Sequence, residues 1–323
     1  METRTLGKTK LNVSRVCCGT MTFGAQAGEA TAIEMIGTCL DHGINFFDTA
    51  NVYNQGASET ILGKALKGRR DRIVLASKVG GKMGPVPDQS GLSREAIRRG
   101  VEDSLRRLQS DFLDLCYLHW PDYTVPVGES LDAMAQLVRE GKVRHIGASN
   151  YASWQICRMI GLAETKGLPP IGVTQPMFNL LTRGIEQELL PMCREFGVAT
   201  VVYNPLAGGL LTGKQEFEAP LPGTRFDLMK NYVDRYWHEA NFTALQELAS
   251  IARDANRSLV SLALNWLLHH SPVDCLVLGA SRLAQLQENL RAIEEDGALS
   301  AEAVAACDLV WARLRGPSPK YNR

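Results

Sequence analysis

The sequence of 323 residues carries 35 basic and 35 acidic side chains, so its formal net charge is zero and its pI is near 7.0. Such a balance provides no long-range attraction to nucleic acid or to an anionic membrane, and neither partner is expected. With 45% hydrophobic and 22% charged residues, the chain is typical of a globular protein with a large core. A small neutral or anionic ligand, bound by local charges, is the expected partner.

The amino-terminal stretch METRTLGKTK lacks the charged and then apolar pattern of a signal peptide, and no apolar run reaches the roughly 18 residues of a membrane-spanning helix. Eight cysteines occur without a C-x-x-C spacing, most of them inside apolar segments such as VCCGT and DLCYLHW. This pattern favours reduced cysteines in a core over a disulfide framework or a zinc site. A soluble, cytoplasmic protein is therefore predicted.

Eight short β-branched or aromatic runs recur along the chain, and longer segments with helical spacing of apolar residues separate them. Alternation of near-continuous apolar strands with helices is typical of a parallel sheet covered by helices, and eight such units predict a closed (β/α)8 TIM barrel. A doubly wound open sheet is the alternative. No change of composition marks a boundary, so a single domain over residues 1–323 is expected. The predicted strands are 15–20, 44–50, 72–79, 114–120, 145–150, 172–179, 199–206 and 275–281.

Three other segments have features of their own. The stretch 93–108 predicts a helix that begins after Ser93, a good N-cap residue. Residues 3–14, with Gly7 between two short alternating stretches, predict a β-hairpin that closes the bottom of the barrel. Residues 207–239, which follow the seventh strand, are rich in glycine, proline and aromatic residues and too long for an ordinary connection, so they predict a functional loop.

Polar residues gather at one end of the predicted strands. Any one of them could be an ordinary strand terminus or helix cap. In a barrel, however, the carboxyl ends of the strands converge on one mouth, where the active sites of this fold lie. Their joint occurrence therefore predicts a functional site there. The residues at or just past these ends are Asp48, Lys78, His119, Ser149, Asn150, Gln175, Asn179, Tyr203, Asn204, Ser281 and Arg282.

Four residues near the ends of three successive strands, Asp48, Tyr53, Lys78 and His119, suit the protonation of a carbonyl oxygen. A free phenol has a pKa of about 10, and a nearby ammonium such as that of Lys78 lowers this pKa. A carboxylate at Asp48 keeps a partly buried lysine protonated and oriented. His119 can then position the carbonyl group or share the proton. Because no side chain supplies a hydride, this arrangement needs an external hydride donor. Taken singly, His119 could be an ordinary satisfied polar residue and Tyr53 a wall of the mouth.

The glycine patterns disfavour two common nucleotide sites. No G-x-G-x-x-G follows a predicted strand, which argues against a Rossmann dinucleotide site. The stretch GGLLTGKQ resembles a P-loop at Gly208, Gly213 and Lys214, but Gln215 stands where a serine or threonine would bind Mg²⁺. Nucleotide hydrolysis is therefore not expected.

The last predicted unit is better suited to a nucleotide. Ser281 can cap a helix there and leave Arg282, Gln285 and Asn289 on a stripe near the helix start. A helix N-terminus beside a guanidinium is a phosphate site, and the two amides could meet an adenine ring. An ordinary exposed helix face is the alternative interpretation.

Five stretches, FFDTANVYNQGASETILG, LASK, DLCYLHWPD, GKVRHIGASNY and VVYNPLAGGLLTGK, resemble the aldo-keto reductases over nearly the whole chain. The resemblance implies a (β/α)8 barrel that reduces carbonyl groups with NADPH. The family's Asp, Tyr, Lys and His tetrad falls on Asp48, Tyr53, Lys78 and His119. RFDLMKNYVDRYW, LQENL and the terminal KYNR are similar to the aflatoxin aldehyde reductase branch, which also reduces succinic semialdehyde.

The resemblance also implies positions for NADPH. The nicotinamide end would lie against Ser149, Asn150, Gln175 and Tyr203. The pyrophosphate would lie near Asn204, Pro205, Leu206, Gly208 and Lys214. The adenosine 2′-phosphate end would lie near Gly279, Ser281, Arg282, Gln285 and Asn289.

For the substrate, the resemblance implies that Arg225 and the terminal Arg323 engage a carboxylate, and Trp120 is expected to contact the substrate. It also allows for a homodimer. The stretches GTMTFGAQAGE and HWP depart from the aflatoxin aldehyde reductase branch, and both are expected at the mouth. The predicted activity is NADPH-dependent reduction of a small aldehyde or ketone by hydride transfer, with Tyr53 as general acid. An NADPH-sensing module that resembles channel auxiliary subunits, and a Schiff-base aldolase using Lys78, stay open as alternatives.

Overall fold

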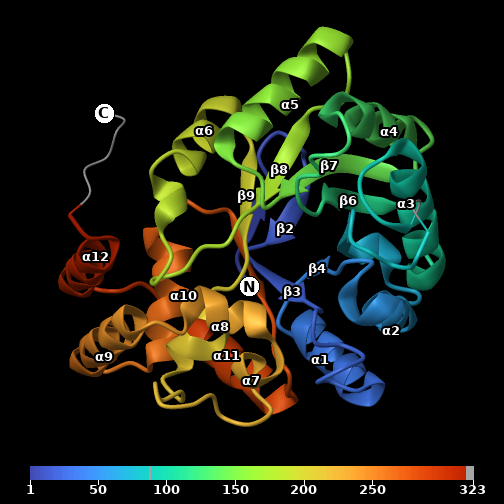
Figure 1. Cartoon of the computed structure of the whole chain (residues 1–323). Helices are drawn as coiled ribbons and strands as arrows, with labels where there is room; N and C mark the ends of the chain where they lie inside the picture. Colours follow the sequence, from blue (N-terminus) through green and yellow to red (C-terminus); the bar gives the residue numbers. More distant parts are fainter. Residues whose placement is uncertain (87–88, 318–323) are drawn as a thin grey trace.

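Eight parallel strands close into a barrel in the computed structural model, which describes residues 1–86 and 89–317 (Figure 1). The strands follow one another around the barrel in chain order, and pairing of the last strand with the first closes the sheet. The eight predicted strands and the (β/α)8 barrel are thus confirmed, and the open sheet is excluded. The strands are β3 (Val16–Gly19), β4 (Phe46–Asp48), β5 (Val74–Val79), β6 (Leu113–Leu118), β7 (Val143–Ser149), β8 (Ile171–Gln175), β9 (Ala199–Val202) and β10 (Cys275–Leu278).

Several strands are shorter than predicted at their carboxyl ends. The predicted strands 172–179 and 199–206 end too late, because β8 stops at Gln175 and β9 at Val202. Beyond β9 the chain leaves the sheet at Asn204, whose φ of 58° belongs to the left-handed region and not to a strand. The polar residues that follow the strands therefore lie on turns around the mouth.

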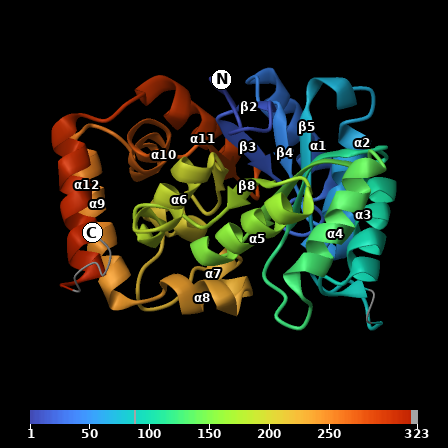
Figure 2. The ribbon, with the colours of Figure 1, turned by 90° about the horizontal axis from the view of Figure 1, so that it is seen from above.

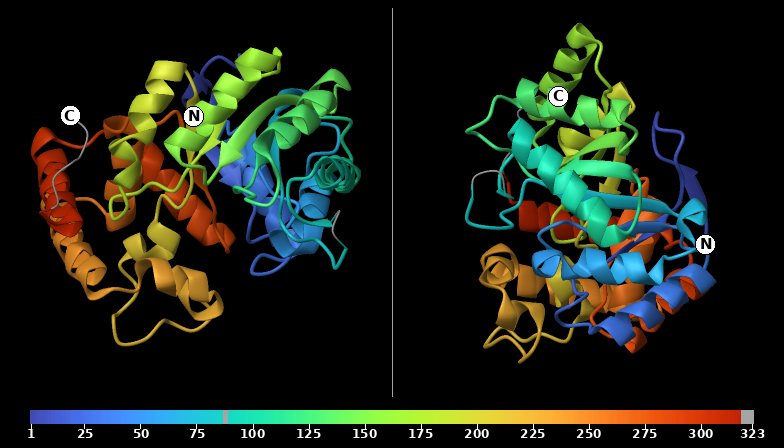
Figure 3. Two further views of the ribbon diagram at one scale, coloured as in Figure 1. Left: turned by 45° about the horizontal axis from the view of Figure 1, so that its top comes forward. Right: turned by 90° about the vertical axis from the view of Figure 1, so that its right-hand side faces the viewer.

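Helices cover the outside of the barrel on all sides (Figure 1). The helices packed around the strands are α1 (Glu29–Asp41), α2 (Ala57–Ala65), α3 (Arg94–Leu108), α4 (Val127–Arg139), α5 (Ser153–Lys166), α6 (Leu189–Phe196), α10 (Leu259–His270) and α11 (Leu283–Asp296). Helices α9 (Glu239–Asp254) and α12 (Ala301–Arg315) lie side by side at one edge of the molecule (Figure 3). Short 3-10 turns are η1 (Tyr53–Gly56), η2 (Arg70–Arg72), η4 (Gly184–Glu186) and η5 (Ala207–Thr212).

Side chains alternate between the two faces of each strand, which gives one apolar core inside the barrel and another between the barrel and its helices. The same alternation decides which polar side chains point into the mouth. Phe46 and Ala76 pack inside the barrel, whereas Phe47 packs between the barrel and its helices. Because successive side chains of a strand point to opposite faces, Asp48 and Lys78 point to the same side as Phe46 and Ala76. Both charged side chains therefore enter the top of the barrel.

The amino-terminal hairpin is confirmed. Strands β1 (Thr3–Thr5) and β2 (Asn12–Ser14) pair antiparallel, and Leu6 and Val13 join the core inside the barrel. Gly7 has a φ of 48°, and a Cβ there would lie 2.8 Å from a backbone oxygen just before β9. Only glycine fits this close approach, by which the hairpin closes the amino-terminal end of the barrel.

The long segment after β9 forms ordered structure at the opposite end of the barrel from the hairpin (Figure 2). It contains η5, α7 (Arg225–Leu228) and α8 (Lys230–Tyr236). Tyr232 and Tyr236 of α8 are buried, which fixes this segment on the barrel. The predicted loop is thus a helical cover beside the mouth.

Two further predictions concern a helix cap and the cysteines. Helix α3 begins at Arg94, and the Oγ of Ser93 accepts a hydrogen bond of 3.3 Å from the amide of Ala96, as predicted. All eight cysteines fall in the described part of the chain as free thiols, and seven of them are buried. Across residues 1–86 and 89–317, no helix is both long and apolar enough to cross a membrane.

Candidate active site

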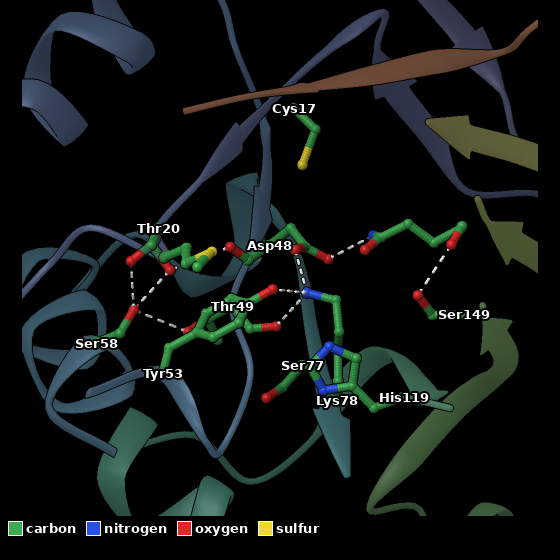
Figure 4. Close-up of polar contacts among 12 residues, drawn as sticks. Cys17, Thr20, Asp48, Thr49, Tyr53, Ser58, Ser77, Lys78, His119 and Ser149 are labelled. Carbon is green, nitrogen blue, oxygen red and sulfur yellow. Dashed lines mark hydrogen bonds and ion pairs between the residues drawn. The ribbon is translucent and has the colours of Figure 1, made fainter. Parts of the chain in front are cut away.

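The centre of the site is a buried ion pair between neighbouring strands. Asp48 ends β4, Lys78 lies near the end of β5, and both are almost fully buried. The Nζ of Lys78 pairs with a carboxylate oxygen of Asp48 and donates to the backbone oxygen of Thr49 at 2.7 Å (Figure 4). Burial lowers the pKa of Lys78, but the Asp48 charge and the hydrogen bonds outweigh it and leave the pKa above its ordinary value. The lysine is therefore held as an ammonium.

The second oxygen of the Asp48 carboxylate has its own partner across the barrel. Nε2 of Gln175 donates to it at 2.9 Å, and Gln175 is the last residue of β8. The carboxylate is thus held from both sides. Sequence patterns gave no sign of this contact, because it joins strands on different sides of the barrel.

The phenol of Tyr53 lies on the turn after β4. The Nζ of Lys78 donates to its hydroxyl oxygen at 3.2 Å. Burial raises the pKa of Tyr53 by more than the Lys78 charge lowers it as predicted, so this pKa lies above its ordinary value. The predicted net lowering is wrong, because desolvation of the phenolate exceeds the attraction of the ammonium. Tyr53 therefore carries its proton at neutral pH.

His119 follows β6 and faces the phenol. Its ring meets that of Tyr53 edge-on, with centroids 6.0 Å apart, and stacks on Trp120 at 4.1 Å. His119 is 7% exposed, and its Nδ1 has no hydrogen-bond partner among residues 1–86 and 89–317. Burial, and then the Lys78 charge, hold the pKa of His119 well below its usual range. The imidazole is therefore neutral, and its unpartnered Nδ1 is buried.

The predicted nicotinamide residues form a connected polar shelf on the other side of the mouth. The Oγ of Ser149 donates to the backbone oxygen of Gln175 at 2.9 Å. The amide of Asn150 donates to the backbone oxygen of His119 at 2.9 Å and accepts from the hydroxyl of Tyr203 at 2.6 Å. Burial raises the pKa of Tyr203 to about 12, so this hydroxyl remains a donor. Asn150 thus connects the shelf to His119, the residue that faces the phenol of Tyr53.

The predicted pyrophosphate residues lie in the turn after β9. Gly208 in η5 has a φ of 70°, and a Cβ there would lie 2.6 Å from the ring of Tyr232. Lys214 is exposed just past η5. The turn thus leaves backbone and an ammonium accessible near α8. The buried members of the set are Asn204, Pro205 and Leu206.

The predicted adenosine residues lie after β10. Helix α11 starts one residue later than expected, with Arg282 at the N-cap, so the prediction that Ser281 caps the helix is wrong. The amide and hydroxyl of Ser281 instead donate to Oε1 of Gln285, at 3.1 and 3.3 Å. Gly279 and Arg282 are exposed. Asn289 is 2% exposed, and its Nδ2 lacks a partner within the described ranges.

These features fit a dinucleotide. A buried amide donor without a partner costs free energy that a polar ligand would recover, and the purine edge of an adenine offers such an acceptor at Asn289. Arg282 is exposed at the start of a 14-residue helix, where backbone amides and a guanidinium favour a phosphate.

The cations of the loop after β9 lie beside the mouth. Nη1 of Arg225 lies 3.5 Å from the hydroxyl of Tyr232, which in turn contacts the sulfur of Met21. Arg235, which no sequence pattern singled out, is exposed with its guanidinium 5.6 Å from the Tyr232 ring centroid. Its position in the same loop as Arg225 was the available signal. Arg323 lies outside the described residues.

Comparison with known proteins agrees with the fold. Residues 15–312 match the Aldo/keto reductase family. The chain is 38% identical over 320 residues to aflatoxin B1 aldehyde reductase member 2 of Rattus norvegicus, covering 94% of this chain and 86% of the relative. The human protein of the same name is 37% identical over 342 residues, covering 100% and 94%. A probable voltage-gated potassium channel subunit beta of Arabidopsis thaliana is 35% identical over 301 residues, covering 91% and 92%.

The chain therefore belongs to the aldo/keto reductase family and is an oxidoreductase. The predicted resemblance is confirmed. Nicotinamide is the cofactor class of this family, in agreement with a site that has a proton donor but no hydride donor of its own.

Proposed function

We propose that this protein reduces aldehydes to alcohols with NADPH and that Tyr53 is the general acid. The observation that carries the proposal is the hydroxyl of Tyr53 at 3.2 Å from the Nζ of Lys78, whose charge Asp48 maintains in a buried site. The names of two relatives, both aldehyde reductases, support an aldehyde as the substrate. Eight free cysteines, seven of them buried, support the cytoplasm as the place of action.

The chemistry that NADPH would supply when held in this site is a hydride for the carbonyl carbon. Tyr53 donates its phenolic proton to the carbonyl oxygen as negative charge develops there. The resulting phenolate lies next to the Lys78 ammonium, which stabilises it, and Asp48 keeps the ammonium charged. Burial keeps the proton on the phenol until a carbonyl oxygen is present to receive it.

His119 orients the carbonyl in this proposal. Its imidazole is neutral and meets the Tyr53 ring edge-on, so a carbonyl oxygen bound at the phenol would lie beside this ring. Trp120, which stacks on the imidazole and is 40% exposed, forms the apolar wall beside it. A neutral donor at this point positions the oxygen without competing with Tyr53 as the source of the proton.

For the cofactor, the charges favour NADPH over NADH. Arg282 would pair with the 2′-phosphate at the start of α11, and Asn289 would satisfy its free amide on the adenine. Lys214 would meet the pyrophosphate beside η5. Ser149, Asn150, Gln175 and Tyr203 would hold the nicotinamide on the shelf.

For the substrate, the guanidinium groups beside the mouth favour an aldehyde that also carries an anion. Arg225 and Arg235 both belong to the loop after β9, and each places its guanidinium over the ring of Tyr232. A carboxylate-bearing aldehyde such as succinic semialdehyde, or a dicarbonyl, fits this arrangement. No ion pair with a substrate carboxylate is needed for the chemistry itself, so other aldehydes are expected to react with weaker binding.

The proposal is tested by substituting Tyr53→Phe and measuring NADPH oxidation with an aldehyde panel. We expect kcat to fall by about 10²- to 10⁴-fold, the contribution of a general acid. NADPH binding, followed by the quenching of protein fluorescence, is expected to stay within about twofold. Wild-type turnover in the Tyr53→Phe variant would rule out the assignment.

The potassium channel subunit among the relatives supports a second candidate, a binding module that senses NADPH. Tight NADPH binding by the wild-type protein without turnover on any aldehyde of the panel would favour it. A Schiff-base mechanism is opposed by Lys78, since a lysine with a raised pKa and a paired charge is a poor nucleophile.

A further inference from the structure

The backbone that follows Tyr53 has an unusual conformation. Asn54, Gln55 and Gly56 have φ values of 51°, 55° and 87°, so three successive residues are left-handed. Glycine adopts this region freely, whereas the other two residues are strained there. Such strain persists only where the surrounding structure imposes it, and it collects at functional sites. Two contacts restrain this turn, one at Asn54 and one at Gly56.

The first restraint is the side chain of Asn54. Its Nδ2 donates two hydrogen bonds, to the backbone oxygens of Met21 at 3.1 Å and Phe23 at 2.6 Å. Both acceptors belong to the loop between β3 and α1, and Phe23 is fully buried. One amide therefore fastens the residue next to Tyr53 to a loop that is itself anchored in the core.

The second restraint lies on the other side of the turn. A Cβ at Gly56 would lie 2.7 Å from Cδ of Arg107, so the turn rests directly on that side chain of α3. Nε of Arg107 donates to the fully buried carboxylate of Glu59 at 2.7 Å, and the same carboxylate accepts from Ser77 at 2.5 Å. Ser77 immediately precedes Lys78 in β5. The carboxylate of Glu59 thus connects Arg107, on which the turn rests, to β5, the strand that carries Lys78.

We propose that Asn54 and Arg107 are positioning residues that hold the phenol of Tyr53 against the ammonium of Lys78. Neither bonds to the phenol or the ammonium; both act on the turn between them. If the turn relaxed, the phenol would move away from the ammonium, and its conjugate base would lose stabilisation that matters only in the proton-transfer step. The inference rests on the proposed role of Tyr53 as general acid.

Substitutions at Asn54 separate the hydrogen bonds from the backbone conformation. Asn54→Asp keeps the shape and the tolerance of the left-handed region but removes the donor and sets a carboxylate against two carbonyl oxygens. Asn54→Gly makes the conformation easy and removes both bonds. The matched control is Asn256→Asp, because Asn256 is also left-handed, with a φ of 53°, but lies exposed at the end of α9.

We expect kcat for aldehyde reduction to fall by about 100-fold in Asn54→Asp, the effect of a displacement of roughly 1 Å, and by about tenfold in Asn54→Gly. KM is expected to change by less than about threefold, and Asn256→Asp is expected to match the wild type. Wild-type kcat in Asn54→Asp would overturn the proposal for Asn54. So would a loss of kcat and of thermal stability in the control Asn256→Asp as large as the loss in Asn54→Asp.

At the second restraint, Arg107→Lys keeps a cation for Glu59 but removes the guanidinium group that packs against Gly56. We expect a loss of kcat of about tenfold, with a thermal midpoint close to that of the wild type. A variant that loses stability but keeps the kcat of its folded fraction would show a merely structural role and overturn the proposal for Arg107.

A measurement without turnover separates this inference from the proposed function. The tyrosinate absorption of each variant is titrated with base and compared with that of the same variant carrying Tyr53→Phe, which isolates the phenol of Tyr53. Displacement from Lys78 is expected to raise the Tyr53 pKa in Asn54→Asp and Arg107→Lys. An unchanged pKa would overturn the positioning role, even if the wild-type protein reduced aldehydes as proposed. A wild-type protein that reduced nothing would overturn the proposed function alone, because the titration still reports where the phenol lies.

Discussion

Three ionisable side chains in the mouth respond differently to the same burial. Burial favours the neutral form of Lys78, Tyr53 and His119 alike. Among residues 1–86 and 89–317, Lys78 alone of the three has a carboxylate partner, at Asp48, and it therefore keeps its charge. The site therefore combines one fixed cation with a protonated phenol and a neutral imidazole, which is the set of protonation states that a general acid for a carbonyl oxygen requires.

Removal of the carboxylate tests this balance. In Asp48→Asn, the attraction that raises the pKa of Lys78 is lost and the burial effect remains, so the lysine pKa is expected to fall. The alkaline limb of the kcat profile should move to lower pH, and kcat at neutral pH should drop by about 100-fold or more. Both are read from NADPH oxidation across the pH range.

The same substitution is expected to lower the free energy of unfolding by about 3 to 5 kcal/mol, since it leaves a buried cation without its partner. Urea unfolding measures this. Glu29→Gln is the matched control, because the ion pair of Glu29 with Lys64 is exposed and should be worth less than about 1 kcal/mol. Equal losses in the two variants would contradict the dominance of the buried pair.

Arg225 and Arg235, the two cations of the loop after β9, are expected to contribute differently to substrate binding. Arg225 is engaged with the Tyr232 hydroxyl, whereas the guanidinium of Arg235 is exposed over the Tyr232 ring. We expect Arg235→Ala to raise KM for succinic semialdehyde by about ten- to hundredfold, the worth of a hydrogen bond to a charged group, and Arg225→Ala to do so by less. An aromatic aldehyde without a carboxylate is the control. Equal changes for both aldehydes would rule out an anion clamp.

Among the helices and strands, those whose ends are marked by nearby residues in the sequence could be predicted. The cap of α3 is an example: Ser93 stands directly before the helix and accepts from Ala96, as its sequence position indicated. At α11 the same reasoning failed by one residue. Ser281 is also a good cap by type, but Gln285 supplies a competing side-chain acceptor, and the helix starts after Arg282.

The cap of α3 makes a stability prediction. Ser93→Ala is expected to lower the free energy of unfolding by about 1 kcal/mol, because the first turn of the helix loses an acceptor for its amide. Thr243→Ala is the comparison, since the exposed hydroxyl of Thr243 donates to a carbonyl oxygen of its own helix, that of Glu239. Its expected change is within about 0.5 kcal/mol. Chemical unfolding of both variants measures the difference.

Across the whole molecule, four histidines with lowered pKa values indicate that stability depends on pH. Burial lowers the pKa of His119, His145, His269 and His270. Between the lowered pKa and the unfolded value of about 6.5, the unfolded chain binds more protons, so the free energy of unfolding rises with pH there. Stability is therefore expected to be full above about pH 6.5 and to decline as the solution is acidified below it.

Urea unfolding near neutral pH and at about pH 5.5 checks this expectation. His145→Gln lies outside the proposed site and should reduce the decline without changing stability at neutral pH by more than about 1 kcal/mol. A free energy of unfolding that stayed constant over this range would contradict the prediction.

The barrel and the four residues of its mouth were readable in the sequence because their signals are local. Apolar runs of strand length repeat eight times, and Asp48, Lys78 and His119 stand where such runs end. The carboxyl ends of all strands lie on one face of such a barrel, so the position of these residues at strand ends was enough to predict that they lie close together. The family resemblance then agreed with the residues found this way.

The protonation states and the supports of the site depend on packing, and the sequence could not show them. Whether burial or Lys78 controls the pKa of Tyr53 is a contest between desolvation and charge, and both quantities exist only once the chain is folded. The contact of Gln175 with Asp48 and that of Arg107 with the turn after Tyr53 join residues far apart in the chain. Local patterns report which side chains are available, whereas distance and burial, which set their chemistry, come from the folded arrangement.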